Sequence, residues 1–304
     1  MRILICSDGS KWATKSARFA LQLFRDTAHE LTVLAFKTRA KELETTQKKM
    51  IRGTREKEDN IGAQRSLTII EEEAQDLVGE LIVDTHEVHW MRQEGDMVSS
   101  ILAIANDYDL ICLGGAGKGG FSQNMLGLIV DEVVKKGDGN LMVTKKSDAK
   151  CRDVLVALMP ETVTEELAHY LGVMFKGSPA TITIDVLWED LPERFEGYLN
   201  AATGQRVKQM VDADLFHDPH QLRDIVAIIE SYGVDCSASY QDYKSLNQLI
   251  DAVEPASYDL IIVHPPSRDS GLLQLIEPEK QSLNLMRKSS ANVMLLRSLP
   301  ALDS

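Results

Sequence analysis

Residues 110–120 read Leu-Ile-Cys-Leu-Gly-Gly-Ala-Gly-Lys-Gly-Gly, an apolar run that leads directly into a loop with five glycines. Glycine has no Cβ, so it adopts positive φ readily and lets successive backbone N–H groups converge on an anion. A helix predicted from about Leu128 would add the positive end of its dipole. The stretch therefore predicts a buried strand, a phosphate-binding loop and a helix, although glycines also form ordinary strand-to-helix turns.

Two common nucleotide motifs do not fit this glycine loop. Lys118 is followed by Gly119 rather than by Ser or Thr, which excludes a phosphate loop of the Walker type. The glycines also lie late in the chain, whereas the dinucleotide fingerprint belongs in the first turn between a strand and a helix. Spacing alone leaves phosphate binding and a plain turn equally open.

Composition indicates a globular protein of two domains. The chain has 304 residues, of which 44% are hydrophobic and 26% are charged. The apolar run at residues 3–6 is too short for a signal peptide, and no segment approaches the roughly 18 apolar residues of a membrane span. We therefore expect a cytoplasmic protein with no membrane partner. The four cysteines lack a paired spacing, so we expect reduced structural thiols.

The charge of the chain argues against nucleic acid as a partner. The formal net charge is −13, and aromatic residues make up only 6%, so the chain offers neither a basic surface nor a stacking platform. Residues 1–150 carry 21 basic and 23 acidic residues, a net charge of −2, whereas residues 151–304 carry 12 and 23, a net charge of −11. An anionic ligand would meet less repulsion in the first half.

The apolar runs of the first half recur in the second half at an offset of about 150 residues. Residues 3–6 correspond to 154–157, 31–35 to 181–185, 108–112 to 258–262, and 140–143 to 292–295. In each copy, continuous aliphatic runs alternate with amphipathic stretches, which is the pattern of a parallel sheet with helices on both faces. The predicted fold class is therefore α/β, with two tandem, open, parallel five-stranded sheets of Rossmann-like type.

The first copy offers a ligand site at one edge of its predicted sheet. Ser10 is a predicted N-cap for a helix whose apolar residues share one stripe: Ala13, Ala17, Ala20, Leu21 and Phe24. Further helices are predicted over residues 67–81, 98–106 and 127–136. The strand order places Asp8 and Gly114 at neighbouring carboxyl ends, where open parallel sheets bind their ligands. The alternative role of Asp8 is a turn or cap residue.

These residues together resemble the universal stress protein family. The family pattern of a glycine, two residues, a glycine, nine residues and a glycine fits Gly114, Gly117 and Gly127. Asp8-Gly9-Ser10 after the first strand and the turn Glu94-Gly95-Asp96 before a helix also match. The resemblance covers the first half well and the second half as a degenerate copy, so the chain looks like a tandem member.

The resemblance implies that the first copy binds ATP, with Mg²⁺ on its phosphates as a further option. Carried over by position, the ligand-binding residues would be Asp8, Gly9, Ser10, Gly114, Gly115, Gly117, Lys118, Gly127 and Leu128. Leu128 departs from the family, in which a hydroxyl residue follows the last glycine. Losing one or two neutral hydrogen bonds costs ~1 kcal/mol each, or about fivefold to thirtyfold in affinity, so we expect weakened binding.

The second copy lacks the features that a phosphate cradle needs. Its corresponding loop begins His264-Pro265-Pro266, and prolines have no amide hydrogen to donate. We therefore expect residues 1–147 to form a candidate nucleotide-binding domain and residues 151–304 a degenerate domain without nucleotide. The second domain is expected to pair with the first and to present an acidic surface. Association of two chains as a homodimer stays open.

The predicted function is a stress-response sensor or regulator, in which an adenine nucleotide biases association with a protein partner that the sequence does not identify. The alternative is an assembly module of the same fold that binds no nucleotide, and a nucleotide-dependent transferase is a third hypothesis. No general base stands out, so no catalytic residue is assigned and at most slow ATP hydrolysis is expected.

Two histidine pairs invite interpretation as metal sites. His86 and His89 are three positions apart in a predicted strand and so point to opposite faces. His217 and His220 flank Asp218-Pro219, a pair that most often begins a helix. We expect no metal site at either pair.

Overall fold

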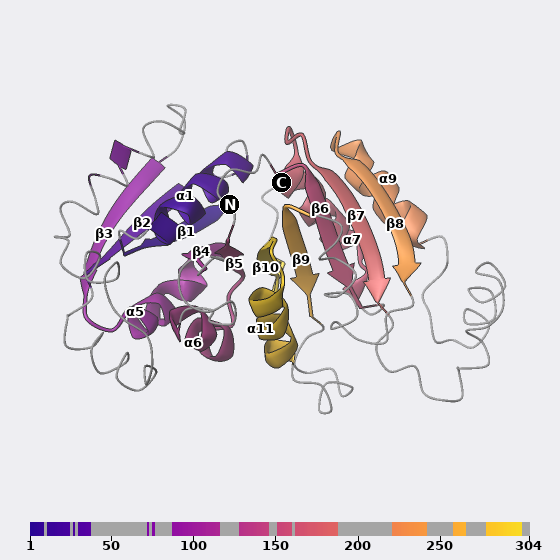
Figure 1. Ribbon diagram of the computed structural model, residues 1–304. Coiled ribbons are helices and arrows are strands. Elements are labelled where there is room, and N and C mark those ends of the chain that lie inside the picture. The colour runs from indigo at the N-terminus through magenta and orange to yellow at the C-terminus, as the bar shows by residue number, and fades with distance from the viewer. Residues whose placement is uncertain are drawn as a thin grey trace. The chain divides into compact units, whose positions relative to one another are not determined.

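The computed structural model describes residues 1–8, 11–24, 27, 30–37, 72, 75–76, 87–115, 128–145, 151–159, 162–187, 221–241, 258–265 and 278–299. The chain forms two compact units, Met1–Lys150 (unit 1) and Cys151–Ser304 (unit 2). Figure 1 shows that each unit contains a sheet with helices packed against it.

Unit 1 is built on five parallel strands in the order β3-β2-β1-β4-β5. Their bounds are β1 Arg2–Ser7, β2 Glu30–Lys37, β3 Glu87–Glu94, β4 Leu110–Gly114 and β5 Leu141–Thr144. Strands β1, β4 and β5 are almost continuously buried. This burial is typical of parallel strands that helices cover on both faces.

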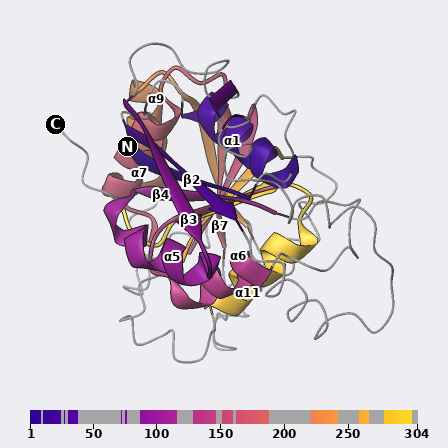
Figure 2. The same cartoon turned by 90° about the vertical axis from the view of Figure 1, so that its left-hand side faces the viewer.

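The described helical elements of unit 1 are α1 Lys11–Leu23, α5 Met97–Ile104, the short 3-10 helix η1 Ala105–Asp107 and α6 Leu128–Lys136. Helix α1 follows β1 and precedes β2, whereas α5 and α6 precede β4 and β5. The connection from β1 to β2 and the connection from β3 to β4 run in opposite directions along the sheet. Because such crossovers are right-handed, α1 lies on one face and α5 and α6 on the other, as Figure 2 shows.

The apolar stripe predicted for α1 is confirmed, because all five of its members are buried: Ala13, Ala17, Ala20, Leu21 and Phe24. The turn before α5 is also set locally. Gly95 has φ +119°, a conformation that glycine adopts without strain. Asp96 then caps the helix, since its side chain accepts a hydrogen bond from the Ser99 backbone N at 3.0 Å.

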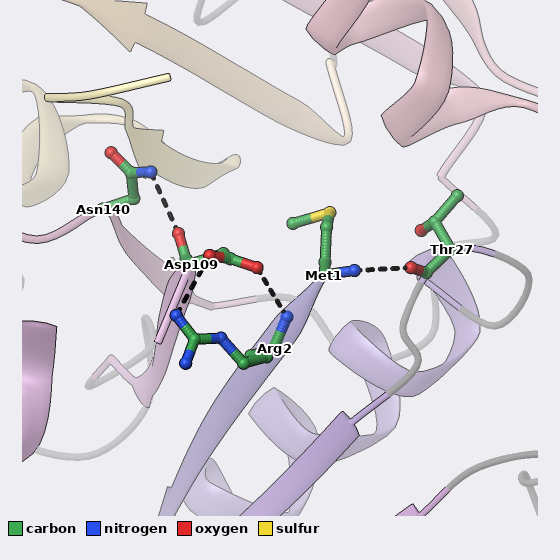
Figure 3. A network of polar contacts seen from close by, with 5 residues as sticks. All are labelled: Met1, Arg2, Thr27, Asp109 and Asn140. Carbon is green, nitrogen blue, oxygen red and sulfur yellow. Dashed lines mark hydrogen bonds and ion pairs between the residues drawn. The ribbon is translucent and has the colours of Figure 1, made fainter. Parts of the chain in front are cut away.

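Asp109 ties the amino ends of β1, β4 and β5 together (Figure 3). The Arg2 backbone N donates to the Asp109 carboxylate at 2.7 Å, and the Asp109 backbone N donates to the Arg2 carbonyl at 2.9 Å. The Asn140 side-chain amide donates to the Asp109 carbonyl at 2.9 Å. The amino group of Met1 donates to the Thr27 carbonyl at 3.0 Å nearby. This network stabilises the sheet at the edge opposite the carboxyl ends of the strands.

Unit 2 repeats the plan with five parallel strands in the order β10-β9-β6-β7-β8. Their bounds are β6 Asp153–Leu158, β7 Thr181–Leu187, β8 Asp235–Gln241, β9 Leu260–His264 and β10 Asn292–Leu295. Its described helices are α7 Glu165–Phe175, α9 Gln221–Ser231 and α11 Pro278–Lys288. The predicted pair of tandem, parallel five-stranded α/β sheets is confirmed.

The internal duplication extends to the polar network. The carboxylate of Asp259 accepts hydrogen bonds from the backbone N of Arg152 at 2.9 Å and of Asp153 at 3.3 Å. The Asp259 backbone N donates to the Asp153 carbonyl at 2.9 Å. Asp259 in unit 2 thus does what Asp109 does in unit 1, at the corresponding strand.

Some predicted features fall outside the described residues. The predicted helix over residues 67–81 is described only at residues 72, 75 and 76, each of which is helical. The histidines His86, His217 and His220 are likewise not described. In the described ranges, no helix combines the length and apolarity needed to cross a membrane. All four cysteines are described and are free thiols: Cys6, Cys112, Cys151 and Cys236.

Candidate functional site

The candidate site of unit 1 lies where the strand order changes direction, between β1 and β4. The two strands pair in parallel, with Ile3 opposite Leu110 and Ile5 opposite Cys112, so their carboxyl ends lie side by side. β1 ends at Ser7 and is followed by Asp8. This is the switch point at which doubly wound sheets bind ligands.

Gly114 ends β4 and lies directly against the first turn of α1. A Cβ added to Gly114 would lie 2.5 Å from the carbonyl C and O of Trp12 and 2.8 Å from the Ala13 backbone N. Any side chain here would collide with helix backbone, which cannot move aside without shifting α1. The absence of a Cβ therefore lets the amino end of α1 sit on the carboxyl end of β4.

Gly115 continues this close packing toward β5. Its backbone N donates to the Thr144 carbonyl at 2.9 Å, and an added Cβ would lie 2.8 Å from Cγ1 of Val143. The Ser16 hydroxyl of α1 lies 3.3 Å from the Thr144 hydroxyl, and both residues are fully buried. Helix α1 and the ends of β4 and β5 are thus packed into one rigid corner.

Two lysines reach this corner from different elements. Nζ of Lys15 lies over the ring of half-buried Trp12, 5.1 Å from its centroid. Cγ of Lys145, the residue after β5, lies 3.4 Å from the position that a Cβ of Gly115 would take. Reasoning from the sequence missed both lysines because it followed the glycine loop. The available signals were a lysine one turn after an aromatic residue and a lysine directly after the last strand.

The structure brings some of the predicted site residues together. Asp8, Gly114 and Gly115 lie at the adjoining ends of β1 and β4, and Leu128 is the first residue of α6. The remaining predicted residues lie outside the described part of the chain: Gly9, Ser10, Gly117, Lys118 and Gly127. The described part of the site is therefore limited to the ends of β1 and β4 and the first residue of α6.

The corresponding edge of unit 2 carries a histidine. His264 ends β9, as Gly114 ends β4, and its Nδ1 lies 2.8 Å from the carbonyl oxygen of Leu296. Burial lowers the pKa of His264, against the opposing effects of that carbonyl and of the Glu166 carboxylate. Pro265 follows and supplies no backbone N–H.

The connection after the first strand of unit 2 also differs. In unit 1, β1 ends at Ser7 and α1 begins at Lys11, whereas in unit 2 β6 ends at Leu158 and α7 begins at Glu165. The position of Asp8 is taken by Met159, whose carbonyl accepts hydrogen bonds from the Thr162 backbone N and hydroxyl. Thr164 then caps α7 by accepting from the Leu167 backbone N at 3.2 Å. In this longer connection Met159 and Thr162 are therefore hydrogen-bonded to each other.

The described residues provide no reactive thiol. Burial raises the pKa of Cys6 and of Cys112, and it raises the pKa of Cys151 and of Cys236 to about 12. Thiolate, the nucleophilic form, is therefore scarce at neutral pH. Among the residues that the structure describes, no cluster of three or more His, Cys, Asp or Glu side chains could hold a metal ion.

The strand order and the glycine-bordered carboxyl edge define a doubly wound α/β protein of Rossmann-like type. Residues 1–145 match the profile of the universal stress protein family. Residues 1–145 therefore belong to this family, and the resemblance predicted from the glycine spacing is confirmed. Among curated proteins, none matches the sequence.

Solved structures extend the likeness to both units. A universal stress protein from Archaeoglobus fulgidus matches 98% of this chain over 97% of its own length, with 14% identity and a TM-score of 0.60. A universal stress protein in complex with cAMP matches 48% of this chain and 98% of its own, at 14% identity and a TM-score of 0.35. One from Archaeoglobus fulgidus in complex with dAMP matches 47% and 96%, at 10% identity and a TM-score of 0.30.

Proposed function

We propose that unit 1 binds an adenine nucleotide, ATP or a close relative, and that occupancy of this site biases association with a protein partner. The observation that carries the proposal is the seating of α1 on Gly114. It brings the end of β1 and the start of the glycine loop to a single corner at the switch point. The proposal extends to this chain the class of ligand named for two of its structural relatives.

The corner suits a phosphorylated ligand in three respects. Gly114 and Gly115 lack a Cβ, which lets α1 and β5 pack closely against the start of the glycine loop and keeps the end of β1 beside it. Helix α6 begins at Leu128, directly after the glycine loop, and its amino end favours negative charge. Asp8 follows the end of β1, where it would lie near the adenosine. A bound Mg²⁺ would neutralise part of the phosphate charge.

The direct test is calorimetric titration of the full chain with ATP and Mg²⁺. We expect a single site per chain with an affinity weakened about fivefold to thirtyfold by the absence of a hydroxyl at position 128. Gly117→Val should abolish binding, because a branched side chain would fill the glycine loop. Gly139→Ala is the matched control, since its nearest contact would be an ordinary 3.7 Å and it lies at the amino end of β5.

The second candidate function is an assembly module of the same fold whose sites hold no nucleotide. Leu128, which stands where the family has a hydroxyl, favours it. Absence of heat from the wild-type chain at millimolar ATP would select this function. A product released in step with a second substrate would instead indicate a transferase.

We propose further that unit 2 binds no nucleotide and serves in association. His264 and Pro265 stand where unit 1 has Gly114 and Gly115, and Met159 stands in place of Asp8, so this corner lacks the carboxylate and one of the two amide N–H groups. One nucleotide per chain rather than two is the expected stoichiometry. Pairing of the two units and formation of a homodimer are parts of the same proposal, and light scattering with and without ATP would test the second.

A further inference from the structure

Trp12 lies in the first turn of α1, and its backbone carbonyl is 2.5 Å from the position that a Cβ of Gly114, the last residue of β4, would take. Ser16 and Phe19 follow it at helical spacings of four and seven residues, and both are buried. The Ser16 hydroxyl lies 3.3 Å from the hydroxyl of Thr144, the last residue of β5. Trp12 is one turn nearer the amino end of α1, so its position in the helix is at the carboxyl end of β4. This place explains why its side chain is only half-buried.

Trp12 brings the charge of Lys15 to the same edge. Side chains of a helix lean toward its amino end, and here the lean carries Nζ of Lys15 to 5.1 Å from the Trp12 ring centroid. The ammonium group is attracted by the face of the indole ring. The positive charge is therefore held at the carboxyl edge.

Lys145 reaches the edge from the opposite side of the corner. It follows β5 directly, and its Cγ lies 3.4 Å from where a Cβ of Gly115 would be. The aliphatic stem of the lysine thus runs beside backbone that carries no side chain. The stem of Lys145 therefore lies next to Gly115, where the glycine loop starts.

We propose that Lys15 and Lys145 are the positively charged contacts for the phosphates of the ligand, and that Trp12 is the positioning residue for Lys15. The inference rests on the proposed nucleotide site and adds its selectivity, namely a preference for ligands with more phosphates. Hydrogen bonds from ammonium groups to phosphate are stronger than those from a neutral hydroxyl. The two lysines would therefore offset part of the affinity that is lost through Leu128. Unit 1 as a whole, with a net charge of only −2 from 21 basic and 23 acidic residues, does little to oppose an anion.

The test compares the affinities of ATP, ADP, AMP and adenosine for the full chain, measured by calorimetry at fixed ionic strength. Lys15→Gln and Lys145→Gln should each weaken ATP binding about tenfold, AMP binding less, and adenosine binding not at all. The slope of log affinity against log salt should also fall in each variant. Arg18→Gln is the matched control, because it removes the same charge from α1 one turn further from the edge.

The positioning role of Trp12 is tested by a double-variant cycle. Trp12→Phe keeps an aromatic face and should bind ATP within about threefold of wild type. Trp12→Leu should lose nearly as much as Lys15→Gln, and the two changes together should lose no more than Lys15→Gln alone. Additive losses would show that Trp12 does not act through Lys15 and would overturn that assignment.

The outcomes separate this inference from the function on which it rests. If the wild-type chain binds ATP but the lysine variants lose no more affinity than Arg18→Gln, the lysine assignment is wrong and the nucleotide site stands. Equal losses for ATP and adenosine would also overturn it, since a phosphate contact cannot act on a ligand without phosphate. If the wild-type chain binds no ATP, the proposed function and this inference are both wrong.

Discussion

The two units share their strand order and the aspartate network at the amino ends of their strands, but their carboxyl edges differ. Asp109 and Asp259 make matching backbone hydrogen bonds, whereas β4 ends in Gly114 and β9 ends in His264. Interactions that hold the sheet together have been kept in both copies. The residues that would meet a ligand have changed in one. In this duplicated fold, the stabilising network thus lies at the amino ends of the strands and the candidate binding site at their carboxyl ends.

Gly114→Ala should produce the largest effect and tests whether this glycine is required by packing alone. The new Cβ would lie 2.5 Å from the backbone of Trp12, so α1 must shift. We expect the free energy of unfolding, measured by urea titration, to fall by ~2–3 kcal/mol. Gly139→Ala should stay within ~0.5 kcal/mol of wild type. A Gly114→Ala variant as stable as wild type would remove the packing argument and leave only the ligand as a reason for the glycine.

Asp109→Ala and Asp259→Ala should produce the next largest effects, similar in the two units. Asp109→Ala removes the carboxylate that accepts a 2.7 Å hydrogen bond from the Arg2 backbone N. Asp259→Ala removes the carboxylate that accepts a 2.9 Å hydrogen bond from the Arg152 backbone N. We expect each to lower the free energy of unfolding by ~1–2 kcal/mol in urea titrations. A large loss in only one unit would show that the two networks are not equivalent.

His264 should make the stability of unit 2 depend on pH. Its pKa in the folded chain lies below the ordinary value of 6.5 because of burial, so the unfolded chain binds the proton more readily. The neutral imidazole therefore stabilises the fold above pH 6.5, and this contribution is lost as the pH falls from 6.5 through the lowered value. Urea midpoints between about pH 7.5 and 5 should decline less in His264→Gln than in wild type. Identical slopes would contradict the prediction.

The smallest effect expected is a difference in thiol labelling between the units. Cys236 is only half-buried, whereas Cys6 and Cys112 are fully buried in β1 and β4. A thiol reagent at pH 8 should therefore label Cys236 first and slowly, because its pKa is raised to about 12. Mass spectrometry of the modified peptides gives the order. Early labelling of Cys6 or Cys112 would show that the sheet of unit 1 opens more readily than its burial indicates.

Much of the fold could be predicted because it depends on periodic features of the sequence. Continuous aliphatic runs such as residues 3–6 and 154–157 are typical of strands that are buried on both faces of a parallel sheet, and their repetition reveals two units. The stripe that includes Ala13 and Phe24 predicts the buried face of α1 in the same way. The neighbouring ends of β1 and β4 then follow from the strand order.

The candidate site was only partly predictable, since it depends on contacts between residues far apart in the chain. Glycine spacing indicated Gly114 as a ligand-binding residue. That a side chain at this position would collide with the Trp12 backbone could not be predicted, because the contact depends on how α1 packs. In the sequence Lys145 is marked only as the residue that directly follows the last strand of unit 1. Its place beside Gly115 arises because β4 and β5 are neighbours.

By itself the sequence determined the α/β class, the tandem organisation, the family and the absence of a hydroxyl at position 128, because these depend on residue types and on spacings along one chain. Only the tertiary structure decided that α1 rests on Gly114, that Trp12 holds the ammonium group of Lys15, and that His264 bonds to Leu296. The physical reason is that periodicity reports which face of a segment is buried. It does not report which distant residue is packed against that face.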